Sequence, residues 1–352
     1  GGIYGIQLGA DSNINIEALE LDLTGTFLAT TGGVNLQWTE EDTTGSCNIS
    51  GVTGLVEATV NTASNIFGVR VRSGPDDTTI SDCSDLTVRA TQANRGAVGF
   101  SILSPSEDAW NTNNPVIENN TNINIESDSG FLAIIGEDGG DTHDCINGII
   151  RGNELSGNGS TAHGICHFGT PNGTRENNTV SGVNLGSLSK ICTGAVTSQN
   201  NEYRDIKPGD TSARYLYSKG SVDAIFQSEK CYITNSFGGE VESALWSDGI
   251  PTSDNVVYLD NEIIQEGGDL EATAVLFKMG SGTDGSTATT TNLAIDQGLT
   301  LPTVIASIAG ASFNTIEDAN AELEVTNMFL FTSGSPTLTT PYSIGTNNGP
   351  LF

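Results

Sequence analysis

Basic residues are scarce in this sequence. Its 352 residues include 13 Lys or Arg against 43 Asp or Glu, which gives a formal net charge of −30. A surface of this sign repels nucleic acid and anionic membranes, so we exclude both as partners. It also disfavours polyanionic substrates unless Ca²⁺ bridges them. Neutral or zwitterionic glycans fit the charge better.

Long apolar runs are missing too. No stretch of about 18 apolar residues occurs, so the sequence predicts no membrane-spanning helix, and no long amphipathic helix is evident. Aromatic residues make up 6% of the chain, which also contains 43 Gly. This composition is typical of a thin aliphatic core with many turns.

The chain begins at Gly1 without a positively charged, apolar leader, which we interpret as a fragment or a processed form.

The six cysteines form no C-x-x-C pair and show no zinc-like spacing. Two interpretations are open. They are either small buried residues of the core or partners in disulfides between neighbouring coils. Cys145 and Cys166, which are 21 residues apart, are the pair to test.

What the sequence does contain is a repeated phrase: an Asn, one further residue, and then an apolar residue. The phrase reads "NELSG" from Asn153 and "NTVSG" from Asn178, and it returns at intervals of 25, 23, 34 and 26 residues. Such intervals indicate a repeat architecture. The positions are Asn153, Asn178, Asn201, Asn235 and Asn261, with a further copy at Asn314.

Short strand-like runs recur in step with this phrase, for example "FLAIIG" from Phe131 and "SALWSD" from Ser243. They are bounded by Gly, Asn, Asp, Ser or Thr, which favours strands. Residues 80–88 align position for position with residues 117–125. One such unit cannot bury its own apolar face, whereas stacked copies bury a continuous core. The sequence therefore predicts an all-β parallel β-helix with its repeated Asn residues stacked at a turn.

The phrase N-x-Φ-x-G (Φ, apolar) and the coil length resemble the right-handed parallel β-helix superfamily of pectate lyases, polygalacturonases and bacteriophage tailspikes, over roughly residues 45–318. The resemblance implies a right-handed solenoid of about ten coils and no particular reaction. No catalytic signature of the lyases or polygalacturonases can be transferred. We expect a lead-in strand and first coil over 1–44, the β-helix over 45–318, and a cap or oligomer junction over 319–352.

The densest ionisable cluster is "GEDGGDTHDC", directly after the run "FLAII". Positions one coil apart become neighbours in a solenoid, so we expect the loop 137–144 and the strand 163–167 on one face. Glycosidases need a proton donor and a second carboxylate. Glu137, Asp141 and Asp144 are the candidates, with His167 as the orienting residue. The alternatives are a solvated acidic loop or a Ca²⁺ site, although the loop lacks the D-x-[DN]-x-[DN]-G order; no other cofactor or metal is predicted.

Aromatic residues beside acids are candidates for sugar stacking. Trp110 lies in a lengthened coil, Trp246 is followed closely by Asp248, and Tyr215 lies in another long coil. We interpret these four residues as glycan subsites. The alternative is that the Trp side chains are partly buried and cover the ends of coils.

Three function classes fit these observations. The first is a homotrimeric virion appendage of the tailspike or fibre type, which contacts other virion proteins and recognises a host surface polysaccharide, with or without cleaving it. The second is a secreted monomeric polysaccharide hydrolase or lyase. The third is a non-catalytic β-helix fibre or capsid decoration. All three place the protein outside the cell or on a virion surface. Whether it acts as a glycoside hydrolase or polysaccharide lyase stays open.

Overall fold

A computed structural model of the chain contains two compact units, Gly1–Val183 (unit 1) and Asn184–Phe352 (unit 2), and each is described by itself. No described helix is long and apolar enough to cross a membrane. The structure describes residues 3–10, 13–27, 31–38, 45–60, 66–91, 96–105, 111–138, 145–159, 161–206, 213–234, 243–248, 255–269, 275–279, 287–299, 304–308, 311–313, 323–331 and 340–342.

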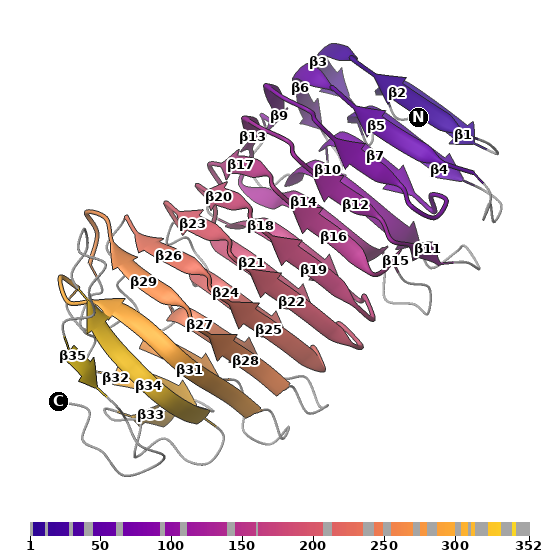
Figure 1. Ribbon diagram of the computed structural model, residues 1–352. Coiled ribbons are helices and arrows are strands. Elements are labelled where there is room, and N and C mark those ends of the chain that lie inside the picture. Colours follow the sequence, from indigo (N-terminus) through magenta and orange to yellow (C-terminus); the bar gives the residue numbers. More distant parts are fainter. Residues whose placement is uncertain are drawn as a thin grey trace. The chain divides into compact units, whose positions relative to one another are not determined.

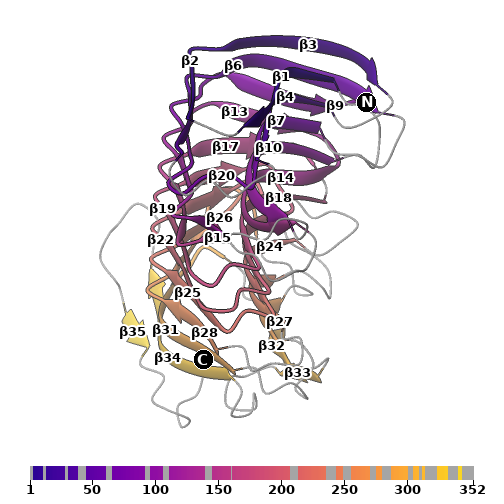
Figure 2. The same cartoon turned by 90° about the vertical axis from the view of Figure 1, so that its right-hand side faces the viewer.

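Unit 1 winds through three strands in each coil, and equivalent strands of successive coils pair in parallel (Figures 1 and 2). Face 1 consists of β1 (Ile3–Ala10), β4 (Thr31–Trp38), β7 (Ile66–Arg72), β10 (Gly96–Pro105), β14 (Ser129–Asp138) and β18 (Thr161–Phe168). Face 2 consists of β2 (Ile14–Glu17), β5 (Cys47–Ser50), β8 (Thr79–Ser81), β12 (Val116–Glu118), β16 (Gly148–Arg151) and β19 (Gly173–Glu176). Face 3 consists of β3 (Glu20–Phe27), β6 (Thr53–Val60), β9 (Leu86–Ala90), β13 (Ile123–Glu126), β17 (Glu154–Gly157) and β20 (Thr179–Ser181). A short pair, β11 (Thr112–Asn113) and β15 (Cys145–Ile146), lies between faces 1 and 2 in the chain.

Unit 2 repeats the three faces and ends differently. Face 1 consists of β21 (Leu185–Lys190), β24 (Arg214–Lys219), β27 (Ser243–Asp248), β30 (Val275–Met279) and β32 (Val304–Ile308). Face 2 consists of β22 (Ala195–Gln199), β25 (Asp223–Gln227), β28 (Asn255–Leu259) and the first half of β31 (Thr287–Asp296). Face 3 consists of β23 (Glu202–Arg204), β26 (Lys230–Ile233), β29 (Glu262–Gln265) and the second half of β31. β34 (Leu323–Phe331) pairs in parallel with β31, whereas β33 (Ala311–Phe313) and β35 (Thr340–Tyr342) pair antiparallel to β32 and β34.

The register confirms the alignment made from the sequence, because Ile117 pairs with Ile80 and Ile125 pairs with Val88. The predicted class, an all-β parallel β-helix, is confirmed as well. The described strands of face 1 number six in unit 1 and five in unit 2, so the coil count differs slightly from the ten expected.

The core of unit 1 is made by the alternation of inward and outward side chains along each strand. On face 2, the inward position is a column of isoleucines, Ile49, Ile80, Ile117 and Ile150, all fully buried. Burying each such side chain contributes about 1.5 to 3 kcal/mol. Arg175 follows Ile150 in this column and is also fully buried.

The corner between faces 2 and 3 of unit 1 has a two-residue pattern. A residue with left-handed backbone comes first, such as Asn119 (φ 55°), Gly152 (φ 63°) or Asn177 (φ 56°). Asn and Gly tolerate this conformation. The next residue turns inward and is buried, and these three inward residues, Asn120, Asn153 and Asn178, form what we call the corner column of unit 1.

Amide hydrogen bonds connect the corner column of unit 1. Asn120 Nδ2 donates to Asn153 Oδ1 (2.8 Å), and Asn153 Nδ2 donates to Asn178 Oδ1 (2.9 Å). The backbone N–H groups of Asn120 and Asn153 donate to the same two oxygens, each at 3.1 Å. The predicted stacking of Asn153 on Asn178 is thereby confirmed.

The corner column of unit 2 consists of Asn201, Glu229 and Asn261, all buried. Asn201 donates from its backbone N and its Nδ2 to the two carboxylate oxygens of Glu229, each at 3.0 Å. The backbone N of Glu229 donates to Asn261 Oδ1 (2.9 Å). The column thus passes through Glu229, which the Asn phrase did not identify. Asn235, which the phrase placed in this series, lies outside the described residues.

The cysteines are buried, free thiols. Cys145 Sγ lies 3.4 Å from the carbonyl oxygen of Gly136, and no disulfide joins it to Cys166. Burial raises the pKa of Cys47 to about 12 and that of Cys83 to about 11. The interpretation of the cysteines as small core residues is therefore confirmed.

Candidate functional site

The predicted catalytic loop begins at the end of β14. Glu137 belongs to that strand and pairs in register with Ser104, but its side chain lies outside the described part of the structure, as do Asp141 and Asp144. β14 and β18 are neighbours, with Phe131 paired to His163 and Ile135 paired to His167. Residues 139–144 of the loop lie outside the described residues, so its expected place beside the strand 163–167 and the catalytic roles stay predictions.

His167 does not face outward. Its register partner Ile135 is a core residue, so the imidazole is directed inward, where it is fully buried with Nε2 3.0 Å from the carbonyl oxygen of Gly148. Burial, and then the nearby charge of Arg175, hold the pKa of His167 well below its usual value. An imidazole in this position cannot orient a carboxylate on the outer surface, which corrects the role expected for it.

The residues predicted to bind glycan differ in how much of each the structure describes. Trp110 lies outside the described residues. Trp246 and Asp248 belong to β27 and pair in register with Tyr217 and Lys219, but their side chains are not among those described. Tyr215 is fully buried, and its hydroxyl donates to the carbonyl oxygen of Tyr232 (2.7 Å). Tyr215 therefore offers no ring face to a sugar, which corrects that expectation.

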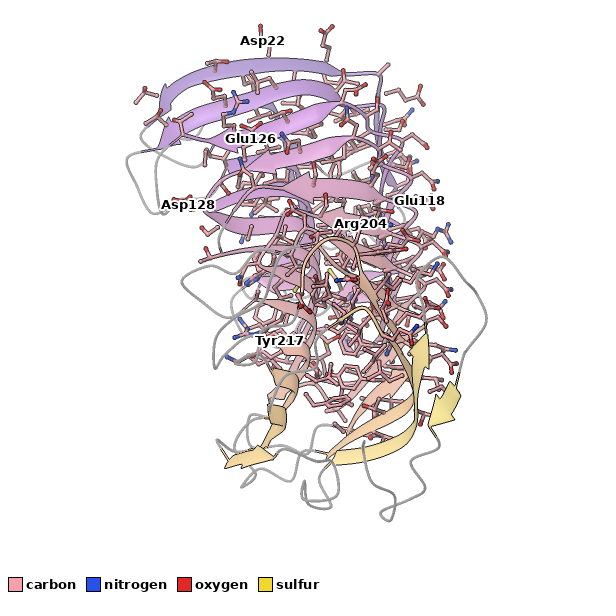
Figure 3. All side chains as sticks on the ribbon, turned by 90° about the vertical axis from the view of Figure 1, so that its left-hand side faces the viewer. Asp22, Glu118, Glu126, Asp128, Arg204 and Tyr217 are labelled. Carbon is pink, nitrogen blue, oxygen red and sulfur yellow. The ribbon has the colours of Figure 1, made fainter. Side chains whose placement is uncertain are left out.

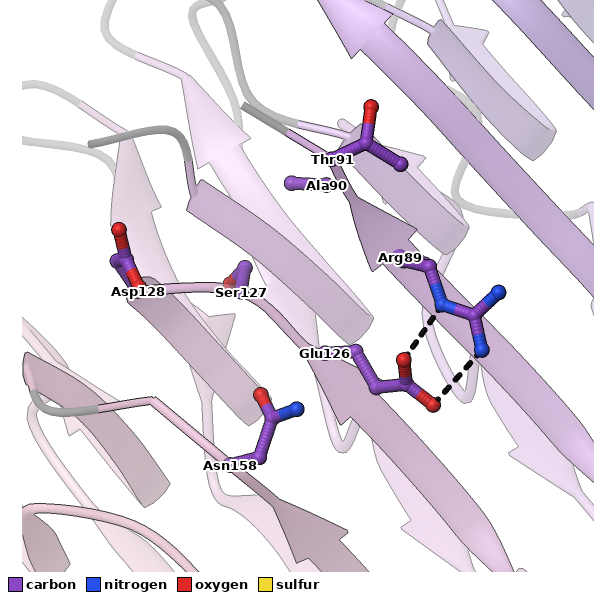
Figure 4. A pocket seen from close by; sticks show the side chains of 7 residues that line it. All are labelled: Arg89, Ala90, Thr91, Glu126, Ser127, Asp128 and Asn158. Atoms are coloured by element: carbon purple, nitrogen blue, oxygen red, sulfur yellow. Dashed lines mark hydrogen bonds and ion pairs between the residues drawn. The ribbon is translucent and has the colours of Figure 1, made fainter. Parts of the chain in front are cut away.

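A polar pocket lies at the corner between faces 3 and 1 of unit 1, where the chain leaves β9, β13 and β17 (Figure 4). Its volume is about 410 Å³, within the range of small-ligand sites. Residues at strand ends and in the turns that follow them, from three successive coils, form it, so the register of the solenoid fixes their spacing. The lining residues are Arg89, Ala90, Thr91, Glu126, Ser127, Asp128 and Asn158.

Arg89 is clamped between two carboxylates from the coils on either side. Its Nε and Nη2 donate to the two oxygens of Glu126 at 2.5 and 3.0 Å, and its Nη1 donates to Glu57 at 2.6 Å. These bonds raise the pKa of Arg89, and the bond from Arg89 lowers the pKa of Glu126. A bidentate pair of this kind fixes the planar guanidinium in place. One wall of the pocket is therefore charged and rigid.

The other side of the pocket is a polar turn. Ser127 Oγ accepts the backbone N–H of Ala97 (3.0 Å), which ties the turn to β10. Asp128 and Asn158 lie on the opposite side of the pocket from Arg89 (Figure 4), and Asn158 is exposed. One cation and two carboxylates thus stand beside neutral hydrogen-bonding groups. None of the lining residues is aromatic.

Unit 2 has a second polar pocket of about 330 Å³ at its corner between faces 2 and 3. Lys230 lies there between register partners Glu202 and Glu262, with its Nζ 3.7 Å from a Glu202 oxygen. The remaining lining residues are Asn200, Ser228 and Asp260. This pocket contains three acids and one base, so it is more negative than the pocket of unit 1.

Among the described residues, no group of three or more His, Cys, Asp or Glu side chains is arranged to hold a metal ion. Comparison of the chain with protein-family models, with curated proteins and with solved structures finds no match. What the protein does must therefore be argued from its own residues.

Proposed function

We propose that this protein is a β-solenoid appendage, of the virion tailspike or fibre type, that recognises a host surface polysaccharide through the pocket around Arg89, Glu126 and Asn158. The observation that carries this proposal is the pocket itself, which sets fixed donors and acceptors at the spacing of successive coils. A polysaccharide also repeats, so several of its hydroxyl groups can engage the same row of turns.

The charge of the pocket selects the kind of glycan. Arg89, Glu126 and Asp128 give it a small net negative charge within a strongly acidic protein. Neutral sugars, or sugars that carry an amine, meet no repulsion there. Because the lining residues include no aromatic side chain, we expect recognition by hydrogen bonds and not by ring stacking.

The solenoid suits an extracellular appendage because it holds the pocket on rigid strands and not on a long loop. Its outer side chains include exposed acids, as Asp22 illustrates for unit 1 (Figure 3). We further propose that copies of the chain assemble into a homo-oligomer, with a homotrimer as the expected form.

The test is a glycan array followed by calorimetric titration of the glycans that bind. Asn158→Ala should weaken binding by about five- to tenfold, since a hydrogen bond contributes about 1 kcal/mol. Asn48→Ala is the matched control, because Asn48 is exposed on face 2 of the same unit and is not part of the pocket. Equal loss in both variants, or no loss in either, would contradict this site.

A further inference from the structure

The described part of the chain contains three Asn-Gly dipeptides, at 147–148, 158–159 and 172–173. Asn before Gly is prone to deamidation, because glycine has no side chain to hinder attack of its backbone nitrogen on the preceding side-chain amide. In all three dipeptides the Asn is exposed and the Gly is buried. Exposure alone therefore does not rank them, and their hydrogen bonds and backbone restraints must.

The dipeptide at 158–159 lies just after β17, outside the strand ladder. Within the described part of the chain, neither the side-chain amide of Asn158 nor the backbone N–H of Gly159 has a hydrogen-bond partner. The bond from Ala162 N to the carbonyl oxygen of Gly159 is long, at 3.4 Å, and does not involve that nitrogen. No hydrogen bond therefore restrains either of the two groups that react with each other.

The dipeptide at 147–148 is restrained on both sides of the reacting bond. Asn147 Nδ2 donates to Asn114 Oδ1 (3.2 Å), and the backbone of Asn147 is left-handed, with φ +56°. Gly148 begins β16 and pairs in register with Gly173. Attack by the nitrogen of Gly148 would rotate its peptide plane out of the strand and would also break the bond of the Asn147 amide.

The dipeptide at 172–173 has an exposed amide but a fixed glycine. Gly173 begins β19, and a Cβ added to it would lie 2.7 Å from two atoms of the buried His167 ring. The strand and this imidazole leave the peptide nitrogen of Gly173 little room to move. The structure thus ranks the three Asn residues, with 158 the most reactive, 172 next and 147 the least.

We propose that Asn158 is a site of covalent modification, where an amide of the pocket turns into a carboxylate without an enzyme. The nitrogen of Gly159 loses its proton to water and bonds to Cγ of Asn158, and the bond from Cγ to Nδ2 breaks as ammonia leaves. A second water then opens the cyclic imide to Asp or isoaspartate. In sum, one amide and one water become a carboxylate and an ammonium ion, and nothing is oxidised or reduced.

This conversion changes the charge of the pocket around Arg89. Asn158 directly follows Gly157, the register partner of Ile125, so it lies on the coil next to Glu126 (Figure 4). A carboxylate there adds a like charge beside Glu126, which is unfavourable. A neutral glycan loses a hydrogen-bond donor, whereas a sugar that carries an amine gains an anion. This consequence rests on the proposed glycan site, but the chemistry at Asn158 does not.

The test is peptide mapping by tandem mass spectrometry while the full folded chain is incubated at mildly alkaline pH. Asn158 should convert severalfold faster than the Asn at 172, and the Asn at 147 should stay intact. In urea the three rates should become similar, because unfolding removes the restraints. Asn158→Gln disfavours ring closure, so it should abolish conversion at 158 and leave the other two sites unchanged. The proposal is overturned if Asn158 in the folded chain converts no faster than the other two.

Glycan titration tests the consequence for binding, with a neutral oligosaccharide that binds on the array and its amine-substituted analogue. Asn158→Asp reproduces one product and should shift the preference severalfold toward the analogue. If Asn158→Ala weakens binding but Asn158→Asp leaves the preference unchanged, the effect on specificity is wrong and the glycan site stands. If neither substitution alters binding, the glycan site is wrong, and mass spectrometry still decides whether Asn158 is modified.

Discussion

The corner columns of the two units provide hydrogen-bond acceptors for buried N–H groups, but the acceptors differ in chemistry. In unit 1 the acceptor for Asn120 is the amide oxygen of Asn153, whereas in unit 2 the acceptor for Asn201 is the carboxylate of Glu229. In both columns the acceptor receives a backbone N–H as well as a side-chain N–H. Both columns therefore require a buried hydrogen-bond acceptor that lies within reach of the N–H groups of the neighbouring coil.

The residues of the two columns differ in the hydrogen bonds that their side chains donate. Asn153 Nδ2 donates to the carbonyl oxygen of Ile117 (3.0 Å), and Asn261 Nδ2 likewise donates to Phe226 O (3.0 Å). An ionised carboxylate has no proton to donate. The comparison indicates that the column tolerates the loss of a donor more readily than the loss of an acceptor.

Removing the acceptor in unit 1 should have the largest effect. Asn153→Leu leaves two N–H donors of Asn120 without their acceptor, whereas the oxygen of Asn178 keeps its bond from the backbone N–H of residue 153. Each buried unsatisfied group costs about 1 to 3 kcal/mol, so we expect the free energy of unfolding to fall by about 2 to 6 kcal/mol in urea titrations. Asn48→Leu, on the exposed side of face 2, should change it little. A loss below about 1 kcal/mol for Asn153→Leu would contradict the column's role.

The pH dependence should reveal the buried imidazole of unit 1. Because the pKa of His167 is lowered in the folded state, the unfolded chain binds a proton below about 6.5 that the folded chain does not. Stability is therefore retained above pH 6.5 and lost as pH falls, by up to about 1.4 kcal/mol per pH unit. His167→Gln should remove this part of the slope between pH 7 and pH 5. The idea fails if wild type and variant keep parallel slopes.

Neutralising the carboxylate in unit 2 should have a moderate effect. Glu229→Gln keeps one acceptor oxygen for Asn201 and replaces the other with an NH2 donor. One charge-assisted bond thus becomes neutral and weaker by about 1 kcal/mol, and the other is lost. Urea unfolding at pH 7 should show a loss of about 1 to 2 kcal/mol. A gain in stability would mean that the cost of burying the charge outweighs its hydrogen bonds, and the comparison of the two columns would have to be revised.

The outer charges should matter least. Arg151 lies between register partners Glu118 and Glu176 and bonds to Glu118 at 2.6 Å, but its side chain is 45% exposed. Exposed ion pairs contribute about 0 to 1 kcal/mol. Arg151→Gln should therefore cost less than about 1 kcal/mol, and this loss should shrink at 1 M salt. A larger loss that does not respond to salt would point to packing and not to charge.

The fold could be predicted from the sequence because the repeated pattern of Asn and apolar residues is visible within the short segment that forms each coil. The Asn phrase identified Asn153, Asn178, Asn201 and Asn261, and the alignment of 80–88 with 117–125 gave the register. Glu229 was missed because a carboxylate fulfils the same acceptor role as an amide. Coil length also varies, from a register offset of 25 residues between Ile149 and Thr174 to 37 residues between Thr79 and Val116. An assumed constant repeat length therefore assigns some residues to the wrong position in their coil.

The candidate site was harder to predict because its residues are not a cluster in the sequence. Arg89 and Glu126 come one residue after the two aligned segments, so the alignment already contained their pairing. Nothing in the sequence showed that Asp128 and Asn158 would close the same pocket, since this depends on where two turns end. The orienting role of His167 was predicted wrongly for a related reason. His167 lies at an inward position of its strand, and a high local density of ionisable residues does not show which way a side chain points.

The central claim is that corner residues of successive coils stack and support one another. A double-mutant cycle with Asn153→Ala and Asn178→Ala, measured by urea unfolding, tests it most directly. The first substitution already removes the bond between the two side chains, which the second would also break, so we predict a coupling of about 1 kcal/mol or more, with the double variant less destabilised than the sum of the single variants. Additivity within about 0.3 kcal/mol would mean that the two amides act independently, and would contradict the account.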